Sequence, residues 1–322
     1  MAVAAFAAGC GNAQAPASPR DQAVEAARSF LDRYVDGDGR VVRREQGGDT
    51  VSEGQAYALL AAVAIGDRPR FDRVWSWTDA HLRRGDGLLS WRWADGRVAD
   101  VQPAADADLD AAHALKLAAT RFGEPALADQ SRRIADAMRG AEIRDGVIVA
   151  GPWARDRGAL NPSYIDPRAL EVLPMDDVAR ASRAAIAPLM RGGAAPPDWA
   201  TLGPPVAATG PPSEAAGGGG AGYGFDAARL PVRLAASCDA QDRRLAASLT
   251  GLRDAAPADH PVFSVARAAQ AAAAGDRGAA DALLDDAAAQ DAQHPSYYGA
   301  AWVALGRALL QTDLLGSCPR GV

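Results

Sequence analysis

The chain has 322 residues, of which 48% are hydrophobic and 23% charged. This composition is typical of a globular protein with a sizeable core and excludes a disordered chain. Its 34 Lys and Arg residues against 40 Asp and Glu residues give a net charge of −6, which argues against nucleic acid or an anionic membrane surface as the main partner.

The first ten residues are apolar and rich in small side chains. They are typical of the end of an export signal, and residues 7–10, which end at Cys10, resemble the lipid-attachment box of bacterial lipoproteins. A disordered, alanine-rich terminus is the alternative interpretation. We expect residues 1–19 to lie outside the folded domain. The export hypothesis predicts an extracytoplasmic protein, secreted or anchored at the cell surface through a lipid on Cys10, its only contact with a membrane.

Helical periodicity dominates from about Arg20 onward, whereas strand-like alternation is short, as in residues 146–150. Many helices without matching strands predict an all-α protein. The lack of a strict repeat favours a closed helical toroid over a solenoid, and we expect one domain over residues 20–322. The expected helices span residues 20–33, 53–65, 69–82, 107–122, 125–138, 167–172, 176–190, 226–236, 241–253, 262–274, 277–290 and 297–312.

Several chemistries lack their motifs in this sequence. The four histidines are far apart and stand in no zinc-binding pattern, so we expect no metal. There is no Gly-x-Ser-x-Gly elbow for a serine hydrolase. The glycine-rich stretch 203–224 lacks the Gly-Lys-Ser/Thr of a phosphate cradle and is interpreted as a flexible surface loop. Carboxylates placed next to aromatic residues remain, and this combination is suited to carbohydrate chemistry.

Glu53 is the first candidate acid. Ser52 and Gln55 fit a capping box at the start of an apolar helix. Taken alone, Glu53 is then better explained as a first-turn acid that the helix dipole favours. A general acid needs a raised pKa. Glu53 therefore serves as one only if burial or a neighbouring carboxylate outweighs the dipole.

Asp106, Asp108 and Asp110 provide candidate neighbours for Glu53. Three acids within five positions are costly on one surface unless some are hydrogen-bonded or functional. We expect one of them to be a helix N-cap and another to be solvated.

Five short segments carry a family resemblance: VSEGQAY (51–57), LLSW (88–91), ADADLD (105–110), NPSY (161–164) and FDAAR (225–229). They occur in the order, and at spacings comparable to those, seen in glycoside hydrolase family 8, a family of bacterial endoglucanases with some lichenases, xylanases and chitosanases. The resemblance runs from about Arg20 to the C-terminus, where SYYG (296–299) also fits.

The resemblance implies an (α/α)6 barrel and an inverting mechanism that requires no cofactor. Glu53 resembles the general acid and Asp226 the general base that holds the attacking water. Tyr164 and Arg229 resemble residues that position this water. The resemblance further implies that Asp106 binds and distorts the sugar at the cleavage point, and that the substrate stacks on Trp91 and Trp153.

Each assignment has a structural alternative. Core packing is the usual fate of tryptophan; we expect it for Trp75, Trp77 and Trp302 on predicted helices, and expect sugar stacking for Trp91 and Trp153 in loops. A surface ion pair at i and i+3 is the alternative for Asp226 and Arg229. The sequence also departs from the family at Phe225, where a tyrosine is common, which removes a hydroxyl from beside the water.

The leading hypothesis is an exported, monomeric, inverting endo-acting hydrolase of β-1,4-linked glucan, either cellulose or a mixed-linkage glucan, linked to processing of an exopolysaccharide. Xylan or chitosan is the alternative substrate, and a non-catalytic glycan-binding protein on the same scaffold is the alternative class. For an exported chain, Cys238 and Cys318 either form a disulfide or remain two free thiols.

Overall fold

The computed structural model describes residues 17–211, 220–256, 259–316 and 318. The expected export segment, including Cys10, lies almost entirely outside the described residues, as does part of the glycine-rich stretch. The first helix begins at Pro19, and the Ser18 side chain caps it by accepting a hydrogen bond from the Asp21 N–H. None of the helices in these ranges is both long and apolar enough to cross a bilayer.

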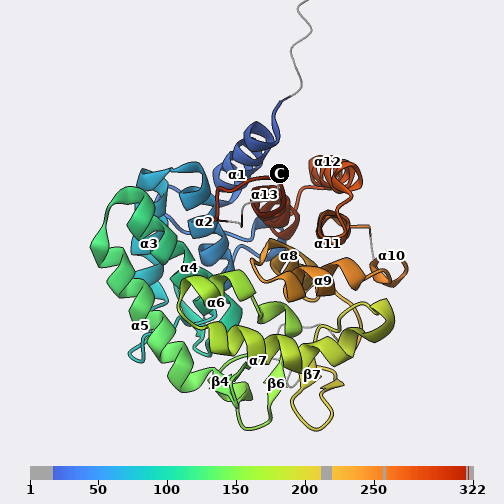
Figure 1. The fold of residues 1–322 in the computed structure, drawn as a ribbon. Coiled ribbons are helices and arrows are strands. Elements are labelled where there is room, and N and C mark those ends of the chain that lie inside the picture. Colours follow the sequence, from blue (N-terminus) through green and yellow to red (C-terminus); the bar gives the residue numbers. More distant parts are fainter. Residues whose placement is uncertain (1–16, 212–219, 257–258, 317, 319–322) are drawn as a thin grey trace, which may run out of the picture.

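Six helices form an inner ring in which each contacts the next and the last returns to the first (Figure 1). A second helix packs on the outside of each inner helix, so the described chain is an all-α (α/α)6 barrel, and the predicted fold class is confirmed. The inner helices are α2 (Ser52–Ile65), α4 (Ala105–Phe122), α6 (Pro167–Val172), α8 (Arg229–Ala236), α11 (Pro261–Ala273) and α13 (Tyr297–Gln311). The outer helices are α1 (Pro19–Tyr34), α3 (Arg68–His81), α5 (Pro125–Ala141), α7 (Asp176–Ile186), α9 (Ala240–Ser248) and α12 (Arg277–Gln293).

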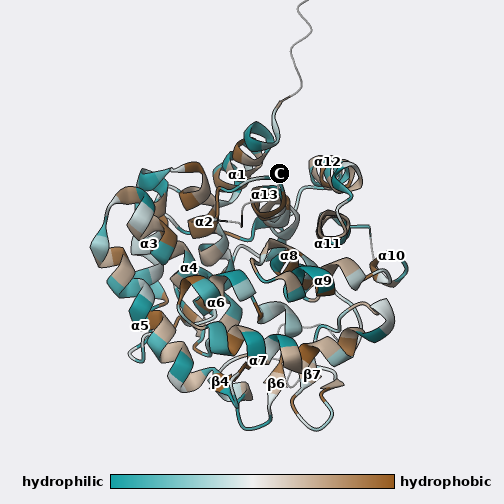
Figure 2. Ribbon diagram, viewed as in Figure 1, coloured by the Kyte–Doolittle hydropathy of each residue, from teal (hydrophilic) through white to brown (hydrophobic). Residues whose placement is uncertain are grey.

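The two rings differ in how their side chains are distributed. In α2 every residue except Glu53 and Ile65 is buried, and most are alanine or leucine, as expected of a helix with neighbours on all sides. The outer helix α5 instead buries one stripe and exposes the opposite face, so hydrophilic and hydrophobic residues alternate along it (Figure 2). Trp75, Trp77 and Trp302 are buried in the core, as predicted.

Short antiparallel strands lie in the loops between helices and adjoin the predicted site residues. One sheet ends directly before Glu53, and strand β6 leads into the NPSY segment and its 3-10 turn at Pro162–Tyr164. The strands are β1 (Thr50–Val51), β2 (Arg92–Ala94) and β3 (Arg97–Asp100) in one sheet, β4 (Ile143–Arg144) and β5 (Val147–Ile148) in a second, and β6 (Ala159–Leu160), β7 (Ala200–Thr201) and β8 (Ala207–Ala208) in a third.

Three predicted helices are three or more residues shorter in the structure. The helix expected over 226–236 begins only at Arg229, because residues 224–228 form a turn. The helix expected over 241–253 is divided into α9 and the short α10 (Leu252–Ala255), since the Gly251 N–H donates to the Gly193 carbonyl instead of continuing the helix. The helix expected over 176–190 ends at Ile186 and continues as 3-10 turns over Ala187–Gly193.

The predicted capping box of α2 is wrong. Val51 is the N-cap, and no side chain caps this end. The Gln55 side chain is used elsewhere: its carbonyl accepts from the Val41 N–H at 2.6 Å, and its amide donates to Thr78 Oγ1 at 2.8 Å. These partners lie 14 and 23 residues away, so a tertiary contact outcompetes the local motif.

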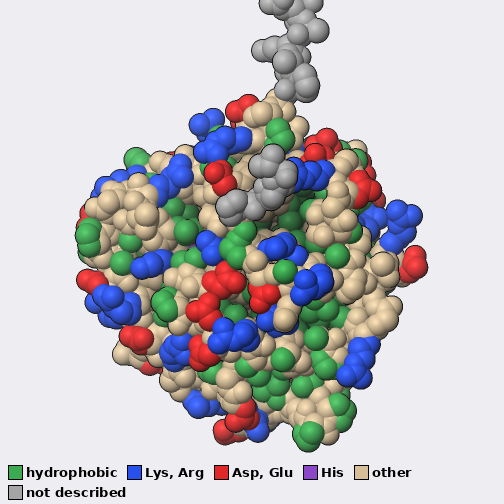
Figure 3. Space-filling model, viewed as in Figure 1, with side chains coloured by type: hydrophobic (Ala, Val, Ile, Leu, Met, Phe, Trp, Pro, Cys, Tyr) green, Lys and Arg blue, Asp and Glu red, His purple; other side chains and the backbone are tan. Residues whose placement is uncertain are grey.

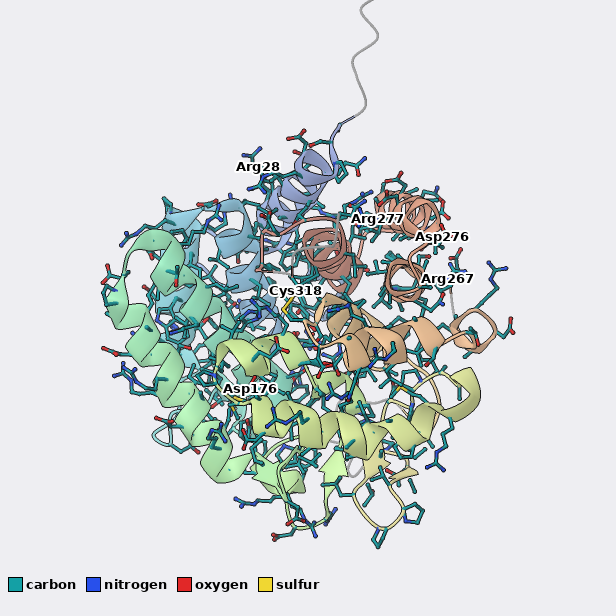
Figure 4. All side chains as sticks on the ribbon, viewed as in Figure 1. Arg28, Asp176, Arg267, Asp276, Arg277 and Cys318 are labelled. Atoms are coloured by element: carbon teal, nitrogen blue, oxygen red, sulfur yellow. A yellow bond between two sulfur atoms is a disulfide. The ribbon has the colours of Figure 1, made fainter. Side chains whose placement is uncertain are left out.

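Cys238 and Cys318 form a disulfide, which resolves the alternative that the sequence leaves open. Cys238 follows α8 closely, and Cys318 lies over the middle of the helix ring in the view of Figure 4. The bond joins positions 80 residues apart, a loop long enough for the cross-link to restrict the unfolded chain by roughly 4 kcal/mol. On the face drawn in Figure 3, basic and acidic side chains are interspersed among hydrophobic ones.

Candidate active site

A cleft of about 640 Å³ opens where the N-terminal ends of the inner helices meet. This volume is in the range of ligand-binding pockets. Its lining includes residues in the first turns of α2 and α13 and residues shortly before α4, α6, α8 and α11. The helix dipoles therefore all direct their positive ends at the cleft. Five of the seven predicted site residues line it, namely Glu53, Trp91, Trp153, Tyr164 and Asp226.

The other two predicted residues, Asp106 and Arg229, lie directly beneath the cleft. Arg229 connects Asp106 to the cleft residues Glu53 and Asp226. Nη1 of Arg229 donates to Asp106 Oδ2 at 2.6 Å and to Glu53 Oε2 at 2.8 Å, and also contacts the Tyr57 hydroxyl at 3.2 Å. Nη2 donates to Asp226 Oδ1 at 3.2 Å. The guanidinium is fully buried, so the alternative of a surface ion pair with Asp226 does not hold.

The Arg229 guanidinium joins Glu53 to Asp226. They accept from neighbouring nitrogens of one planar group, which keeps them within the roughly 9.5 Å that is the upper limit for an inverting pair. Their side chains are 18% and 28% exposed, respectively, whereas that of Asp106 is 3% exposed. Glu53 and Asp226 are therefore the two carboxylates of this cluster that reach the open space.

Burial raises the pKa of Glu53 to about 7. The Arg229 cation opposes this shift, while the charges of Asp106 and Asp226 add to it. Glu53 thus has the raised pKa that a general acid needs, because burial and two neighbouring carboxylates outweigh both the cation and the helix dipole.

Burial also raises the pKa of Asp226, to about 6. Arg229 again opposes the shift, and the negative charges of Asp198 and Asp106 add to it. The second oxygen, Oδ2, accepts from the Asn161 amide at 2.9 Å, which favours the ionised form. Between about pH 6 and 7 the pair therefore holds one carboxylic acid, Glu53, and one carboxylate, Asp226.

Aromatic side chains form the walls of the cleft. Trp91 and Trp153 are each partly exposed to it, and Trp153 is fixed by a hydrogen bond from Nε1 to the Pro103 carbonyl at 3.0 Å. The Tyr164 ring lies 5.2 Å from the guanidinium carbon of Arg229. Phe225, 44% exposed, packs against His260 with ring centroids 5.1 Å apart and presents a bare ring at the rim.

The three acids of α4 are all buried, so the expectation of one N-cap and one solvated acid is wrong. Ala104 is the N-cap, and the three side chains point to three different partners. Asp106 binds Arg229, Asp108 accepts from the Leu89 N–H at 2.8 Å, and Asp110 makes two bonds of 2.7 and 2.8 Å to Arg233.

Four further residues belong to the site and have no role in the sequence-based prediction. Tyr57, Asn161 and Tyr297 stand inside the quoted segments, and the Tyr297 hydroxyl donates to Glu53 Oε1 at 3.4 Å. Their positions in those segments could have identified them as site residues from the sequence. The fourth, Asp198, stands in none of them and contacts the turn that carries Asp226.

A ring of paired helices whose N-terminal ends surround a cleft with an acid and a base defines a barrel suited to glycoside cleavage. Residues 1–202 match the family described as Glycosyl hydrolases family 8, and the chain belongs to this family.

The chain is also similar to curated relatives. It is 34% identical over 161 residues to an endoglucanase of Cellulomonas uda, covering 45% of this chain and 44% of that one. It is 33% identical over 227 residues to a probable endoglucanase of Novacetimonas hansenii, covering 63% and 64%. The matches thus span less than two thirds of these curated relatives. Among solved structures, it resembles a GH8 endo-β-1,4-glucanase from an Achatina fulica gut metagenomic library, with a TM-score of 0.68, 25% identity, and coverage of 87% and 95%.

Proposed function

We propose that this protein is an inverting, endo-acting glycoside hydrolase that cleaves β-1,4-linked glucan, either cellulose or a mixed-linkage glucan. The observation that carries the proposal is that Glu53 and Asp226 reach one open cleft, are bound by the two terminal nitrogens of the buried Arg229, and differ in their pKa values. The similarity to proteins named endoglucanases supports glucan as the substrate class.

In this mechanism Glu53, protonated below about pH 7, donates its proton to the glycosidic oxygen as the bond to the anomeric carbon breaks. Asp226 accepts a proton from a water that attacks the anomeric carbon from the opposite face, so the product has inverted configuration. Asn161 and Arg229 hold the two Asp226 oxygens, which orients the base. In this proposal Asp106, linked to Glu53 through Arg229, binds the sugar at the cleavage point, and the Trp91 and Trp153 rings, which line the cleft, stack on neighbouring sugars.

The test is reducing-sugar release from soluble β-glucans together with NMR of the newly formed anomeric centre. We expect α-configured product ends and a bell-shaped pH profile with limbs near 6 and 7. Glu53→Gln and Asp226→Asn should each lower kcat by about 10²- to 10⁴-fold. Asp129→Asn, which alters an exposed acid on α5, is the control and should retain wild-type activity.

Equal activity of the wild type and both site variants would remove the proposal. Cleavage of xylan or chitosan in place of glucan would change the substrate within the family. Binding of cello-oligosaccharides with no cleavage after long incubation would instead identify a glycan-binding protein on this scaffold.

We also propose that the protein acts outside the cytoplasm as a monomer, on an exopolysaccharide, with a lipid on Cys10 as its anchor. The apolar first ten residues support export, and so does the Cys238–Cys318 disulfide, because such bonds persist in oxidising compartments. Cell fractionation tests the anchor: Cys10→Ser should move the protein from the membrane to the soluble fraction, and an unchanged distribution would reject it.

A further inference from the structure

Asp198 is a buried carboxylate behind the base. It lies immediately before Trp199 and β7, 28 residues from Asp226 in the sequence, and is 3% exposed. It does not line the cleft itself, but its neighbour Trp199 does. The Trp199 ring packs near those of Trp153 and Tyr164, with centroids 6.3 and 6.2 Å away. The dipeptide 198–199 therefore places Asp198 behind the base and Trp199 in the aromatic wall.

Asp198 contacts the turn that carries Asp226 at several points. Its Oδ1 accepts from the Ala227 N–H, the residue after the base, at 2.8 Å. Its own N–H donates to the Gly222 carbonyl at 2.8 Å. The carboxylate also lies directly against Gly224, where an added Cβ would be 2.1 Å from Oδ2. A glycine at 224 is thus required by this carboxylate, not by its own backbone angle.

We propose that Asp198 is a positioning residue for the general base, one that fixes the turn bearing Asp226 and maintains a negative charge behind it. This inference rests on the proposed function, because it assigns Asp198 a role only through Asp226. An acid that merely caps a loop would supply the hydrogen bond but would have no effect on when the base is ionised.

The charge of Asp198 acts mainly on one of the two catalytic groups. It is among the largest influences on the pKa of Asp226, which it raises, but not among the largest influences on that of Glu53. Burial raises the pKa of Asp198 itself, while N–H groups of the turn oppose that shift and favour its ionised form. The titratable, charged and amide groups that face Asp226 are Glu53, Asp106, Asn161, Tyr164, Asp198, Arg229 and Tyr298.

Asp198→Asn removes the charge but keeps one oxygen that accepts from the Ala227 N–H. Removing a negative charge lowers the pKa of Asp226. The acid limb of the kcat/KM profile should therefore move to lower pH, by roughly 0.5–1 unit, while the alkaline limb stays in place. Asp198→Ala, which also loses the acceptor, should lower kcat about tenfold or more with KM nearly unchanged, and Asp198→Asn should recover most of this loss.

Gly224→Ala makes the complementary change. Its methyl displaces the carboxylate from the turn but leaves the charge present, so kcat should fall while the acid limb moves less than in Asp198→Asn. Asp242→Asn is the matched control. Asp242 is an equally buried acid that binds Arg183 and Ser237 away from the cleft, and its replacement should move neither limb.

The outcomes separate the two proposals. If the wild type hydrolyses glucan and Asp226→Asn does not, an unmoved acid limb in Asp198→Asn overturns the inference and leaves the proposed function intact. Should Asp198→Asn fail to fold, as judged by thermal unfolding, wild-type kcat in a folded Gly224→Ala variant would overturn it instead. A wild type without hydrolytic activity overturns the proposed function itself.

Discussion

Two arginine clusters lie one helical turn apart in the barrel and have the same construction. Arg229 and Arg233 are spaced four residues apart on α8, and their partners Asp106 and Asp110 are spaced four apart on α4. Both guanidinium groups are buried. The first binds Glu53 and Asp226 in addition, and the second binds Asp166.

The clusters differ in charge balance and in access. Three carboxylates surround Arg229 and two of them reach the cleft, whereas Arg233 has two carboxylates whose side chains are 3% and 12% exposed. Burial raises the pKa of Asp110 to about 6, close to the value for Asp226. A raised pKa therefore does not by itself mark a reacting group. What distinguishes Asp226 from Asp110 is that a substrate can reach it.

Replacing Arg229 should break the first cluster and cause the largest effect. In Arg229→Met three carboxylates face one another without a cation, so the pKa of Asp226 rises and the base is protonated at neutral pH. We expect kcat/KM to fall about 10²- to 10³-fold or more, with the acid limb shifted upward. Arg229→Lys keeps the charge but loses the two terminal nitrogens that bind separate carboxylates. Its acid limb should therefore stay close to the wild-type pH, while its kcat/KM still falls. A wild-type pH profile in Arg229→Met would contradict this account.

Replacing Arg233 should break the second cluster and affect stability instead. Arg233→Met leaves Asp110 and Asp166 buried without their cation, which should lower the free energy of unfolding by about 3–5 kcal/mol in urea denaturation. Activity per folded molecule should stay within a few-fold of wild type. The double variant with Asp110→Asn should recover part of the stability, because one buried charge is gone. A loss of activity as large as that of Arg229→Met would mean that the two clusters are not distinct.

The sequence predicts most of this architecture, since helices are encoded by local periodicity. Its errors occur where long-range contacts decide. Gln55 is diverted from a capping box by Val41 and Thr78. Asp226 precedes its helix because a carboxylate 28 residues away holds the turn. No local pattern specifies such a pairing between two loops, so the sequence alone could not identify Asp198 as a site residue.

The acids of α4 show the same limit. Their spacing in the sequence is visible, but it does not tell which face of the helix meets an arginine, and this depends on where α8 packs. Asp106 and Asp110 meet arginines of that helix, whereas Asp108, two residues from each, points elsewhere.

Asp108 extends the comparison of the two clusters, because it is a buried acid of α4 that lies next to another acid and not next to an arginine. Its partner is Glu142, after α5, and both are fully buried. Apart from each other, Asp108 Oδ2 and both Glu142 carboxyl oxygens have no hydrogen-bond partner among the described residues. Burial raises both pKa values well above their ordinary range. The Asp108 charge adds to the shift of Glu142, and the Asp106 charge adds to that of Asp108, which the Leu89 N–H opposes. The folded protein therefore retains protons here that the unfolded chain releases above about pH 4.

The sign of the pH dependence follows from these raised pKa values. Stability from this pair is fully present below about pH 4 and is lost as the pH rises toward the folded-state values, by about 1.4 kcal/mol per pH unit for each retained proton. Glu142→Gln removes one titrating group and supplies an amide donor for Asp108. Its free energy of unfolding in urea at pH 5, 6 and 7 should therefore fall less steeply than that of the wild type, by about one proton's slope. Glu124→Gln, an exposed acid at the start of the same helix, should run parallel to wild type, and parallel curves for Glu142→Gln as well would show that the pair retains no proton.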